Sequence, residues 1–293
     1  MIKKKTIFLF GFGQVAKYLI KKIGKKNHNS FFLTSTKKTQ ITKILNRNLK
    51  VFYFKNNKYD KKIRSCLKKS DYILVSIPPN KKGDLVVKNF QNILKKKTFK
   101  KLIYLSATNV YGNHEGKWVT EKSKLKAKTI NGKNRMLAEK QWLSLKNKYN
   151  LNIDILRLGG IYSKEKNAFK RLKAGSATFV KKDNHYFSRI RVEDIVQIIE
   201  KIFSKNKKIF GEIFNVADDL PASNEQVVKF VASLLKIKKL NKIDFTKIKP
   251  SKMKDFYKDS KRVNNRKVKK LLKIKLKFPT FKDGLKNLKN QSM

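Results

Sequence analysis

The chain has 293 residues, 40% of them hydrophobic, and its 74 Lys and Arg against 20 Asp and Glu give a formal net charge of +54. This length and hydrophobic content are enough for a core, either in one large α/β domain or in two smaller ones. No stretch approaches the roughly 18 consecutive apolar residues of a membrane span, and the single cysteine, Cys66, excludes an intramolecular disulfide. We therefore expect a cytoplasmic protein, in a reducing compartment, with no membrane partner.

The positive charge at first suggests a nucleic-acid-binding protein. Only 9 of the 74 basic residues are Arg, however, and the 65 Lys are scattered along the whole chain. Nucleic-acid-binding proteins usually concentrate Arg in a localised stripe. The wealth of Lys, Asn, Ile and Phe is instead typical of drift in an AT-rich genome, so we expect no specific nucleic acid partner. Binding to polyanions through charge alone stays as a third hypothesis.

The N-terminal segment has the pattern of a strand, a tight turn and a helix. Residues 6–10 are an unbroken apolar or β-branched run, as expected for a parallel strand covered on both faces. Gly11, Gly13 and Ala16 follow with the spacing GxGxxA, a variant of the dinucleotide-binding fingerprint in which the glycines allow a sharp turn and the close approach of a phosphate. The residues predicted to contact a dinucleotide here are Gly11, Phe12, Gly13, Gln14 and Val15.

The end of the second predicted strand, residues 30–34, indicates which dinucleotide binds. An NAD site usually has a carboxylate about 20 residues after the glycines, where it accepts a hydrogen bond from the ribose 2′-hydroxyl. This chain has no Asp or Glu before Asp60 and instead offers hydroxyl and ammonium donors, which suit a 2′-phosphate. We therefore predict NADP as the cofactor, with NAD left open, and we predict contacts from Thr34, Ser35, Thr36 and Lys37.

Strand and helix patterns alternate through the first half of the chain. The further predicted strands are residues 48–54, 71–77, 101–106 and 151–158, and the predicted helices are residues 59–69, 83–97 and 133–149. This alternation predicts an α/β fold, a Rossmann-type doubly wound parallel sheet, in a dinucleotide-binding domain of residues 1–162. In such a sheet the ligand lies beyond the carboxyl ends of the strands, so Ile77, Pro78 and Ser106 are expected to line the cofactor crevice.

From residue 163 the alternation is lost. The sequence predicts short extended pieces at 179–180 and 186–187, helices at 192–202 and 223–235, a strand at 213–216, and a basic helical end broken at Pro279. Ser223, with Gln226 three residues later, has the pattern of a helix capping box. We expect residues 163–293 to form a small mixed α/β substrate lobe that packs on the first domain and partly rejoins its sheet.

Several segments taken together resemble one family. Residues 105–112, Leu-Ser-Ala-Thr-Asn-Val-Tyr-Gly, resemble the SSxxVYG segment of the extended short-chain dehydrogenases, the NAD-dependent epimerase/dehydratase superfamily. The likeness spans roughly residues 5–290, with matching segments at 138–139, 157–162, 189–195 and 214–219, and residues 118–121 and 138–142 look most like an atypical subgroup. The resemblance implies a Rossmann fold, a bound nicotinamide dinucleotide, and activity as an oxidoreductase or epimerase on a small, sugar-like or anionic substrate.

The catalytic residues that the resemblance implies are replaced in this chain. Such enzymes use a Tyr as acid/base, a Lys four residues later that lowers the pKa of the Tyr, and a Ser or Thr beside the substrate oxygen. Alignment on Ala138-Glu139 puts Asn131 at the Tyr position, Arg135 at the Lys position and Ala107 at the Ser/Thr position. The nearest substitutes are the catalytic candidates Thr108, Arg135 and Tyr162. For Tyr162, a packed aromatic residue is the alternative interpretation.

Two arginines in the second half are candidates for substrate binding. Arg189 and Arg191 stand just before a predicted helix in an arginine-poor chain, where they could bind an anionic group such as phosphate. A structural ion pair with Glu193 or another acid is the alternative. No metal site is predicted, because no His, Cys and carboxylate spacing suggests one, and the histidines are isolated: His28, His114 and His185.

Three functions stay open on the sequence. The first is an NAD(P)-dependent oxidoreductase or epimerase-like enzyme with a small-molecule substrate and a replaced Tyr/Lys pair. The second is a non-catalytic NADP-binding regulator or partner-binding protein, which the replaced Tyr and Lys favour. The third is the polyanion binder, which only the charge favours. A homodimer is compatible with the sequence, which does not determine the oligomeric state.

Overall fold

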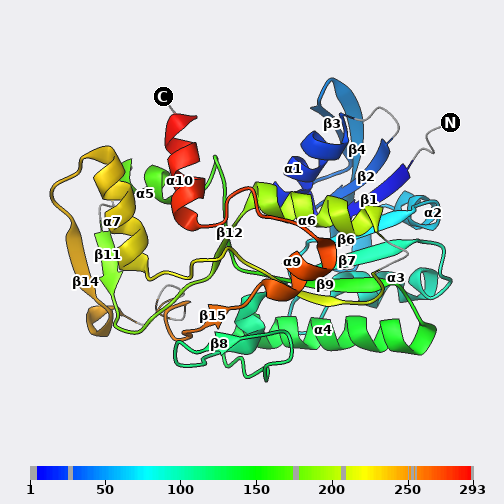
Figure 1. Ribbon diagram of the computed structural model, residues 1–293. Coiled ribbons are helices and arrows are strands. Elements are labelled where there is room, and N and C mark those ends of the chain that lie inside the picture. The colour runs from blue at the N-terminus through cyan, green and yellow to red at the C-terminus, as the bar shows by residue number, and fades with distance from the viewer. Residues whose placement is uncertain are drawn as a thin grey trace. The chain divides into compact units, whose positions relative to one another are not determined.

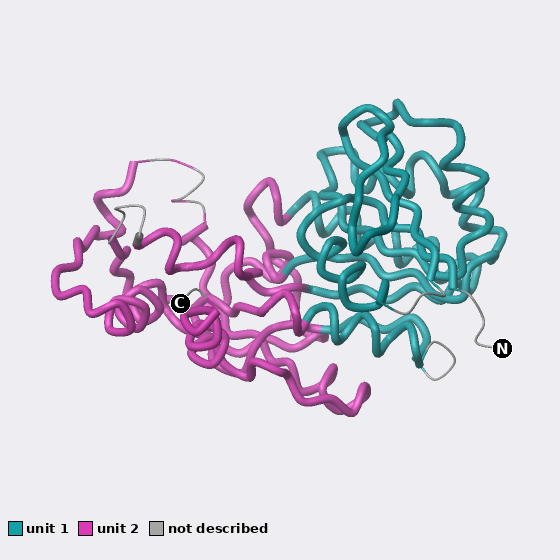
Figure 2. The backbone as a smooth tube through the Cα atoms, turned by 90° about the horizontal axis from the view of Figure 1, so that it is seen from above, with its two compact units in different colours: residues 1–107, 133–157, 195–214 teal, residues 108–132, 158–194, 215–293 magenta. Residues whose placement is uncertain are grey.

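The computed structural model describes residues 5–25, 29–173, 178–205, 209–249, 251, 254 and 256–291; His28 lies outside these ranges. The chain divides into two compact units (Figure 2). Unit 1 contains residues 1–107, 133–157 and 195–214, and unit 2 contains residues 108–132, 158–194 and 215–293. This division differs from a single boundary after residue 162, because residues 108–132 fall in unit 2 and residues 195–214 return to unit 1.

Unit 1 is built on a nine-stranded, mostly parallel sheet (Figure 1). Its strands are β1 (Lys5–Phe10), β2 (Asn29–Ser35), β3 (Gln40–Ile44), β4 (Arg47–Lys55), β5 (Lys58–Tyr59), β6 (Tyr72–Val75), β7 (Lys101–Ala107), β9 (Ile153–Leu158) and β13 (Ile213–Val216). Their order is β13-β9-β7-β6-β1-β2-β4-β3, with β5 paired to β4. Parallel pairs join β1 to β2 and β6, β6 to β7, and β2 to β4. The predicted Rossmann-type sheet is confirmed, and β13 rejoins it from the second half of the chain.

Helices cover both faces of this sheet (Figure 1). They are α1 (Gln14–Ile23), α2 (Lys62–Lys68), α3 (Leu85–Leu94), α4 (Ile130–Tyr149) and α6 (Val192–Ser204). Ile73 of β6 belongs to a buried cluster that includes Phe90 of α3 and Trp142 of α4. The preceding residue, Tyr72, points to the opposite face, where its ring centroid lies 4.7 Å from that of Phe203 of α6. Successive side chains of a strand point to opposite faces, so an unbroken apolar strand contributes to a core on each side of the sheet. This agrees with the prediction of a sheet that is covered on both faces.

The hairpin of β3 and β4 is a feature of the fold that the sequence pattern does not predict. β3 runs antiparallel to β4 at the end of the strand order, and most of its residues are exposed or half-buried. Leu45 and Asn46 form the turn with φ angles of 52° and 57°. An edge strand covered on neither face needs no apolar run, so hydrophobic patterning alone does not reveal it.

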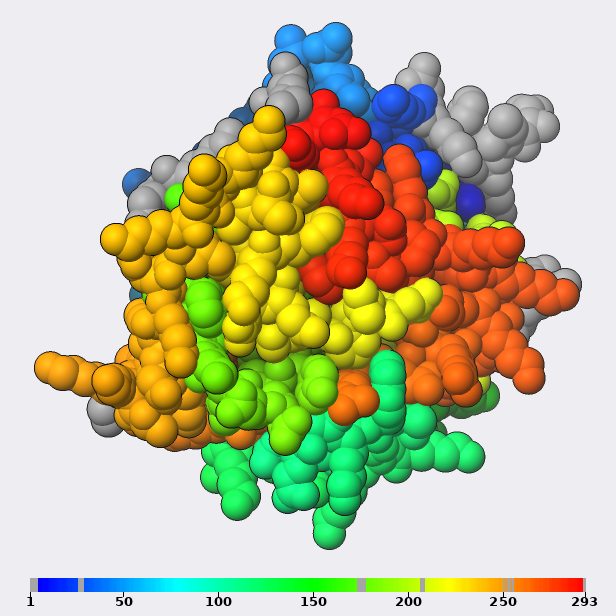
Figure 3. Space-filling model, turned by 60° about the vertical axis from the view of Figure 1, so that its left-hand side comes forward, coloured from blue at the N-terminus to red at the C-terminus, as the bar shows by residue number. Residues whose placement is uncertain are grey.

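Unit 2 is a mixed α/β body with three two-stranded parallel pairs: β10–β12, β11–β14 and β15–β8. Its elements are η1 (Thr108–Tyr111), β8 (Trp118–Val119), β10 (Gly160–Tyr162), α5 (Ala168–Lys173), β11 (Thr178–Lys181), β12 (Arg189–Arg191), α7 (Asn224–Leu235), β14 (Asn241–Asp244), η2 (Phe245–Lys247), β15 (Arg262–Val263), α9 (Arg266–Leu272) and α10 (Phe281–Asn290). α7 and α10 lie side by side at its surface (Figure 3) and share one apolar cluster with α5. The predicted capping box is confirmed, since Ser223 and Gln226 make both reciprocal bonds at the start of α7.

Two of the segments that carried the family resemblance meet inside unit 2. The Tyr111 hydroxyl donates a 2.6 Å hydrogen bond to Asn215 Oδ1, and Tyr111 is fully buried. Glu121 Oε1 accepts a hydrogen bond from the backbone N–H of Asn215 at 2.8 Å. These motif residues therefore hold the unit together. In the described part of the chain, no helix is long and apolar enough to cross a membrane.

Candidate functional site

The turn between β1 and α1 is fixed by neighbouring strands of unit 1. Gly11 has a φ of +101° and donates its backbone N–H to Thr34 Oγ1 at 3.0 Å. The Ser76 hydroxyl donates to the carbonyl oxygen of Phe10 at 2.9 Å. A Cβ on Gly11 would lie 2.6 Å from Ser76 Oγ, so this position requires glycine for the fold itself.

Gly13 is in a different situation, because a Cβ placed there would meet no atom within 4 Å. Gly13 is the N-cap of α1, in extended backbone conformation, and as a glycine it has no side chain that could cap the first amides of this helix. Such amides and the helix dipole attract an anion. The adjacent Gln14 Nε2 is buried without a hydrogen-bond partner among the described residues. The turn thus has the space and the unmet donors that a phosphate-bearing ligand requires.

The end of β2 presents its donors at the surface. Thr36 and Lys37 are exposed, and the Lys37 backbone N–H donates to Ser35 Oγ at 3.3 Å. Asp60, the first acid of the chain, accepts from Thr39 Oγ1 at 3.0 Å and from the backbone N–H of Lys62 at 2.9 Å. Both oxygens of that carboxylate are therefore engaged by the protein, while the Lys37 ammonium has no protein partner in the described ranges.

The predicted cofactor residues gather at one edge of the unit 1 sheet. β1, β2, β6 and β7 are parallel neighbours, so their carboxyl ends coincide. Ile77 and the exposed Pro78 come two and three residues after the end of β6, and Ser106 is the penultimate residue of β7. This is the edge at which parallel α/β sheets bind ligands.

The Ser106 side chain is hydrogen-bonded to a buried ion pair. The Ser106 hydroxyl donates a 2.5 Å hydrogen bond to Glu139 Oε1 of α4. Glu139 in turn pairs with Arg157 of β9, whose Nη2 lies 2.7 Å from Glu139 Oε2. All three side chains are at most 3% exposed. The proton of the Ser106 hydroxyl is therefore committed to Glu139, which leaves the Ser106 oxygen only as an acceptor.

Arg135 keeps a cation at the position where the resemblance implies a Lys. Its Nη1 donates to the carbonyl oxygen of Leu105 at 3.0 Å, which ties α4 to the end of β7. Asn131, at the implied Tyr position, is exposed near the start of the same helix. A guanidinium can bind a ribose hydroxyl or an oxyanion but cannot transfer a proton at neutral pH. Thr108 begins η1 in unit 2, half-buried.

Asp84 is a buried acid of unit 1 that was not among the predicted site residues. It is the N-cap of α3, and its Oδ1 accepts from the backbone N–H groups of Val86 and Val87 at 2.8 and 3.1 Å. Burial raises the pKa of Asp84 to about 6, although these bonds and the charge of Arg135 act in the opposite direction. An Asp directly before a helical apolar run is a recognisable N-cap signal.

Tyr162 lies in the apolar core of unit 2. It is 8% exposed, and a Cβ on Gly284 of α10 would collide with its hydroxyl. Burial, reinforced by the charge of Asp218, raises the pKa of Tyr162 far above its ordinary value. A phenol in this state stays protonated at neutral pH and is a poor proton donor, and the contacts are those of a packing residue. Its catalytic role therefore stays a prediction.

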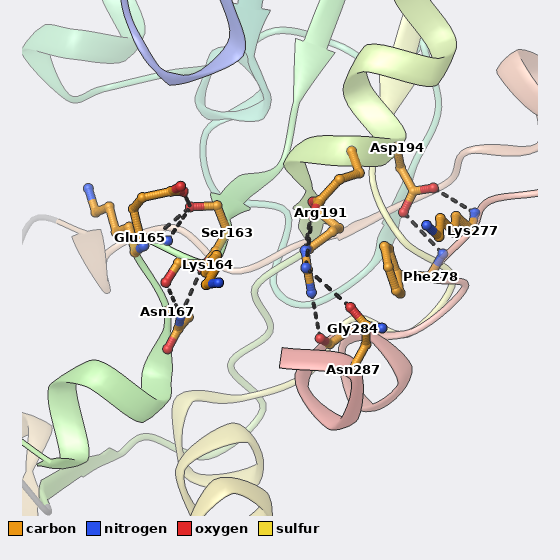
Figure 4. Close-up of polar contacts among 12 residues, drawn as sticks. Ser163, Lys164, Glu165, Asn167, Arg191, Asp194, Lys277, Phe278, Gly284 and Asn287 are labelled. Carbon is orange, nitrogen blue, oxygen red and sulfur yellow. Dashed lines mark hydrogen bonds and ion pairs between the residues drawn. The ribbon is translucent and has the colours of Figure 1, made fainter. Parts of the chain in front are cut away.

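The two candidate arginines of β12 differ in their surroundings. Arg191 is fully buried, and its Nε and Nη2 bind the two carboxylate oxygens of Glu193 at 2.7 and 2.9 Å. Its Nη1 donates to the carbonyl oxygen of Gly284 at 2.6 Å (Figure 4). The ion pair with Glu193 is thus the interpretation that the geometry supports for Arg191. Arg189 is half-buried and anchored only through Nη1.

Asp194, beside this pair, fastens the segment before α10. Its two carboxylate oxygens accept the backbone N–H groups of Lys277 at 2.6 Å and Phe278 at 3.2 Å (Figure 4). Arg191 and Asp194 therefore both serve the attachment of the C-terminal segment to unit 2.

Comparisons with known proteins support the fold. No family model and no curated protein matches the sequence. A solved protein of unknown function from Silicibacter pomeroyi DSS is 27% identical, with a TM-score of 0.86 over 98% of this chain and 99% of that one. UDP-glucuronic acid 4-epimerase from Bacillus cereus, solved with UDP-glucuronic acid and NAD, is 16% identical, with a TM-score of 0.77 over 98% and 100%. dTDP-glucose 4,6-dehydratase from Bacillus anthracis, solved with NAD, is 14% identical, with a TM-score of 0.75 over 97% and 95%.

The chain therefore has the fold of the NAD-dependent epimerases and dehydratases, the extended short-chain dehydrogenases. The resemblance read from residues 105–112 and the other segments is confirmed at the level of the fold, along the whole chain. At these identities the solved enzymes establish the architecture, and activity has to be argued from the residues of this chain.

Proposed function

We propose that this chain is an NADP-dependent oxidoreductase or epimerase-like enzyme that acts on a small, sugar-like or anionic substrate without the usual Tyr/Lys pair. The observation that carries this proposal is the bare N-terminus of α1 behind Gly13, where the fold leaves open space. Gly11, Phe12, Gly13, Gln14 and Val15 would hold the pyrophosphate of the dinucleotide. When bound, the nicotinamide would supply hydride chemistry.

The preference for NADP rests on the end of β2. Thr36 and Lys37 are exposed donors, and the nearest carboxylate in sequence, Asp60, is engaged by Thr39 and by the start of α2. A 2′-phosphate gains from an ammonium, whereas a 2′-hydroxyl favours a carboxylate acceptor. The solved enzymes of this fold contain NAD, so cofactor choice is the point at which this chain is proposed to differ from them.

The proposed chemistry assigns limited roles to the catalytic candidates. Arg135 would bind the ribose or stabilise a developing oxyanion, and Thr108 would hydrogen-bond a substrate oxygen. Neither group is an acid/base at neutral pH, so protons would be exchanged with solvent or with Tyr162. The sugar nucleotides named with the solved epimerase and dehydratase make a sugar-like substrate the first class to test.

A second candidate function is a non-catalytic NADP-responsive regulator. The exposed Asn131 at the implied Tyr position is the observation that favours it, since no proton donor replaces the Tyr there. Titration with NADPH and NADH, followed by turnover assays over sugar nucleotides and small carbonyl compounds, separates the alternatives. NADPH binding with substrate-dependent turnover supports the enzyme, and binding without turnover supports the regulator. Absence of cofactor binding, with salt-sensitive binding to DNA, would leave only the polyanion binder.

A further inference from the structure

Residues 76–84 connect β6 to α3 at the carboxyl edge of the unit 1 sheet, and their first residue is fixed to β1. The backbone N–H and the hydroxyl of Ser76 both donate to the carbonyl oxygen of Phe10 at 2.9 Å. A Cβ on Gly11 would lie 3.0 Å from Ile77 Cγ2, so the Ile77 side chain lies against the glycine turn. A shift of this segment would therefore move Ile77 relative to the turn that is proposed to hold the pyrophosphate.

The other end of this segment is a tight turn with its own hydrogen bonds. The backbone N–H of Asn80 donates to the carbonyl oxygen of Gly83 at 3.1 Å, and the N–H of Gly83 donates back to Asn80 at 2.9 Å. Asn80 Oδ1 also accepts the backbone N–H of Lys82 at 2.8 Å. Gly83 has a φ of +93°, which residues with a Cβ rarely adopt. The turn is thus defined by its own sequence, and Pro78 and Pro79 restrict the backbone before it.

Gln141 joins this turn to α4, the helix that carries Arg135. Its Oε1 accepts the backbone N–H of Asp84 at 2.7 Å, and its Nε2 lies 3.5 Å from the carbonyl oxygen of Lys82. A Cβ on Gly83 would collide with the amide of Gln141, so this amide lies directly against the glycine. The half-buried Gln141 side chain therefore contacts the last three residues of the segment.

The two elements that Gln141 connects are themselves well packed. Trp142, the next residue of α4, is fully buried in one cluster with Phe90 of α3, and its ring centroid lies 5.9 Å from that of Tyr104 of β7. Asp84 is buried and caps α3 with its side chain. The bond between Gln141 and Asp84 thus joins α4 to the start of α3, directly after the tight turn.

We propose that Gln141 is a positioning residue for the dinucleotide site: it fastens residues 76–84 to α4 and thereby keeps Ile77 against the turn at Gly11. The inference rests on the proposed function, because it assumes that this turn holds a dinucleotide. Gln141 acts through the segment and is not assigned a contact with the cofactor. With Ser76 fixed at one end and Gln141 at the other, the segment is ordered before the cofactor binds. Loss of one connection would add a cost of ordering to binding and so weaken it.

The test combines NADPH affinity of the full-length chain, from fluorescence titration, with hydrogen–deuterium exchange of residues 76–84 in the absence of ligand. Gln141→Met keeps the size of the side chain but removes the acceptor for Asp84. It should weaken NADPH binding about 10-fold and speed exchange in the segment. Gln141→Glu keeps an acceptor oxygen and should restore the affinity to within about 3-fold of the wild type. A purely structural role would not give this rescue in affinity and exchange together.

Gln226→Met is the matched control. Gln226 Oε1 accepts the backbone N–H of Ser223 at 2.8 Å in unit 2, so this change removes the same kind of bond elsewhere in the chain. NADPH affinity should stay within about 2-fold of the wild type, and exchange of residues 76–84 should not change.

Wild-type NADPH affinity in Gln141→Met would overturn the inference and leave the cofactor site intact. Equal losses of affinity in Gln141→Met and Gln226→Met would also overturn it, by showing an effect of reduced stability alone. A wild-type chain that binds no NADPH would instead overturn the proposed function. Faster exchange of residues 76–84 in Gln141→Met would then still support the fastening of the segment to α4, so the two failures are distinguishable.

Discussion

The Ser106 hydroxyl donates a 2.5 Å hydrogen bond to Glu139, and Glu139 is paired with Arg157 in the same buried position. Glu139→Gln keeps an acceptor for Ser106 but leaves the Arg157 charge without its partner. We expect a loss of about 3–5 kcal/mol in the free energy of unfolding, measured by urea denaturation. Glu225→Gln, in the exposed pair with Lys229 on α7, is the matched control and should cost less than about 0.5 kcal/mol. Equal losses of unfolding free energy in the two variants would mean that the buried pair of Glu139 and Arg157 contributes no more to stability than a surface pair.

The pair of Glu139 and Arg157 is a feature of the fold that could not be predicted from the sequence. The sequence marks Glu139 and Arg157 only as parts of segments that resemble the family, because a charged residue in an apolar segment does not reveal its partner. Their pairing joins residues 18 positions apart on α4 and β9, and only the fold brings them together. By contrast, Gly11 and the Ser223–Gln226 capping box depend on local geometry, which patterns of a few residues encode well.

The arginines of β12 show the same limit. The sequence places Arg189 and Arg191 together before a helix, but Arg191 is fully buried whereas Arg189 is half-buried. Arg191 contacts Gly284, 93 positions away, whereas Arg189 is anchored to Ala222. The spacing of the two arginines in the sequence does not predict which of them has its donors engaged by such distant contacts. β3 is not predictable from the sequence for a related reason, since an exposed edge strand carries no apolar signal.

Lys37→Glu tests the preference for NADP. Replacing the exposed ammonium by a carboxylate should weaken NADPH binding by about 10-fold or more and leave NADH binding unchanged or tighter, because only NADPH carries the 2′-phosphate. Fluorescence titration with both cofactors measures this. Lys43→Glu, exposed on β3, makes the same charge change and should affect neither. Equal weakening of both cofactors by Lys37→Glu would remove the argument for the phosphate.

Tyr162→Phe separates packing from catalysis. The hydroxyl has no partner among the described residues, so its removal should leave the free energy of unfolding unchanged or raise it by up to about 1 kcal/mol. Turnover should stay within about 2-fold of the wild type if Tyr162 only packs against α10. A stable variant that loses turnover would restore Tyr162 as the proton donor.

Asp84 should make stability depend on pH in a defined window. Its pKa of about 6 in the folded protein exceeds the ordinary value of about 4, so the folded state holds the proton more tightly than the unfolded state. The free energy of unfolding should therefore fall as pH rises from about 4 to about 6 and then level off. Asp84→Asn, which keeps an N-cap oxygen, should gain about 2 kcal/mol relative to the wild type between pH 4 and pH 7. A difference that does not change with pH would show that Asp84 titrates normally.

The most direct measurement is NADPH affinity, together with thermal stability, of Gly13→Asp. The site has room for the new side chain, the backbone is in the extended conformation of an N-cap, and a carboxylate there caps α1. We expect the free energy of unfolding to rise by about 1 kcal/mol while NADPH affinity falls by about 100-fold or more, because the carboxylate occupies and repels the place of the pyrophosphate. Gly13→Ala should be intermediate in affinity. A stabilised Gly13→Asp variant that binds NADPH as tightly as the wild type would contradict the dinucleotide site at this helix.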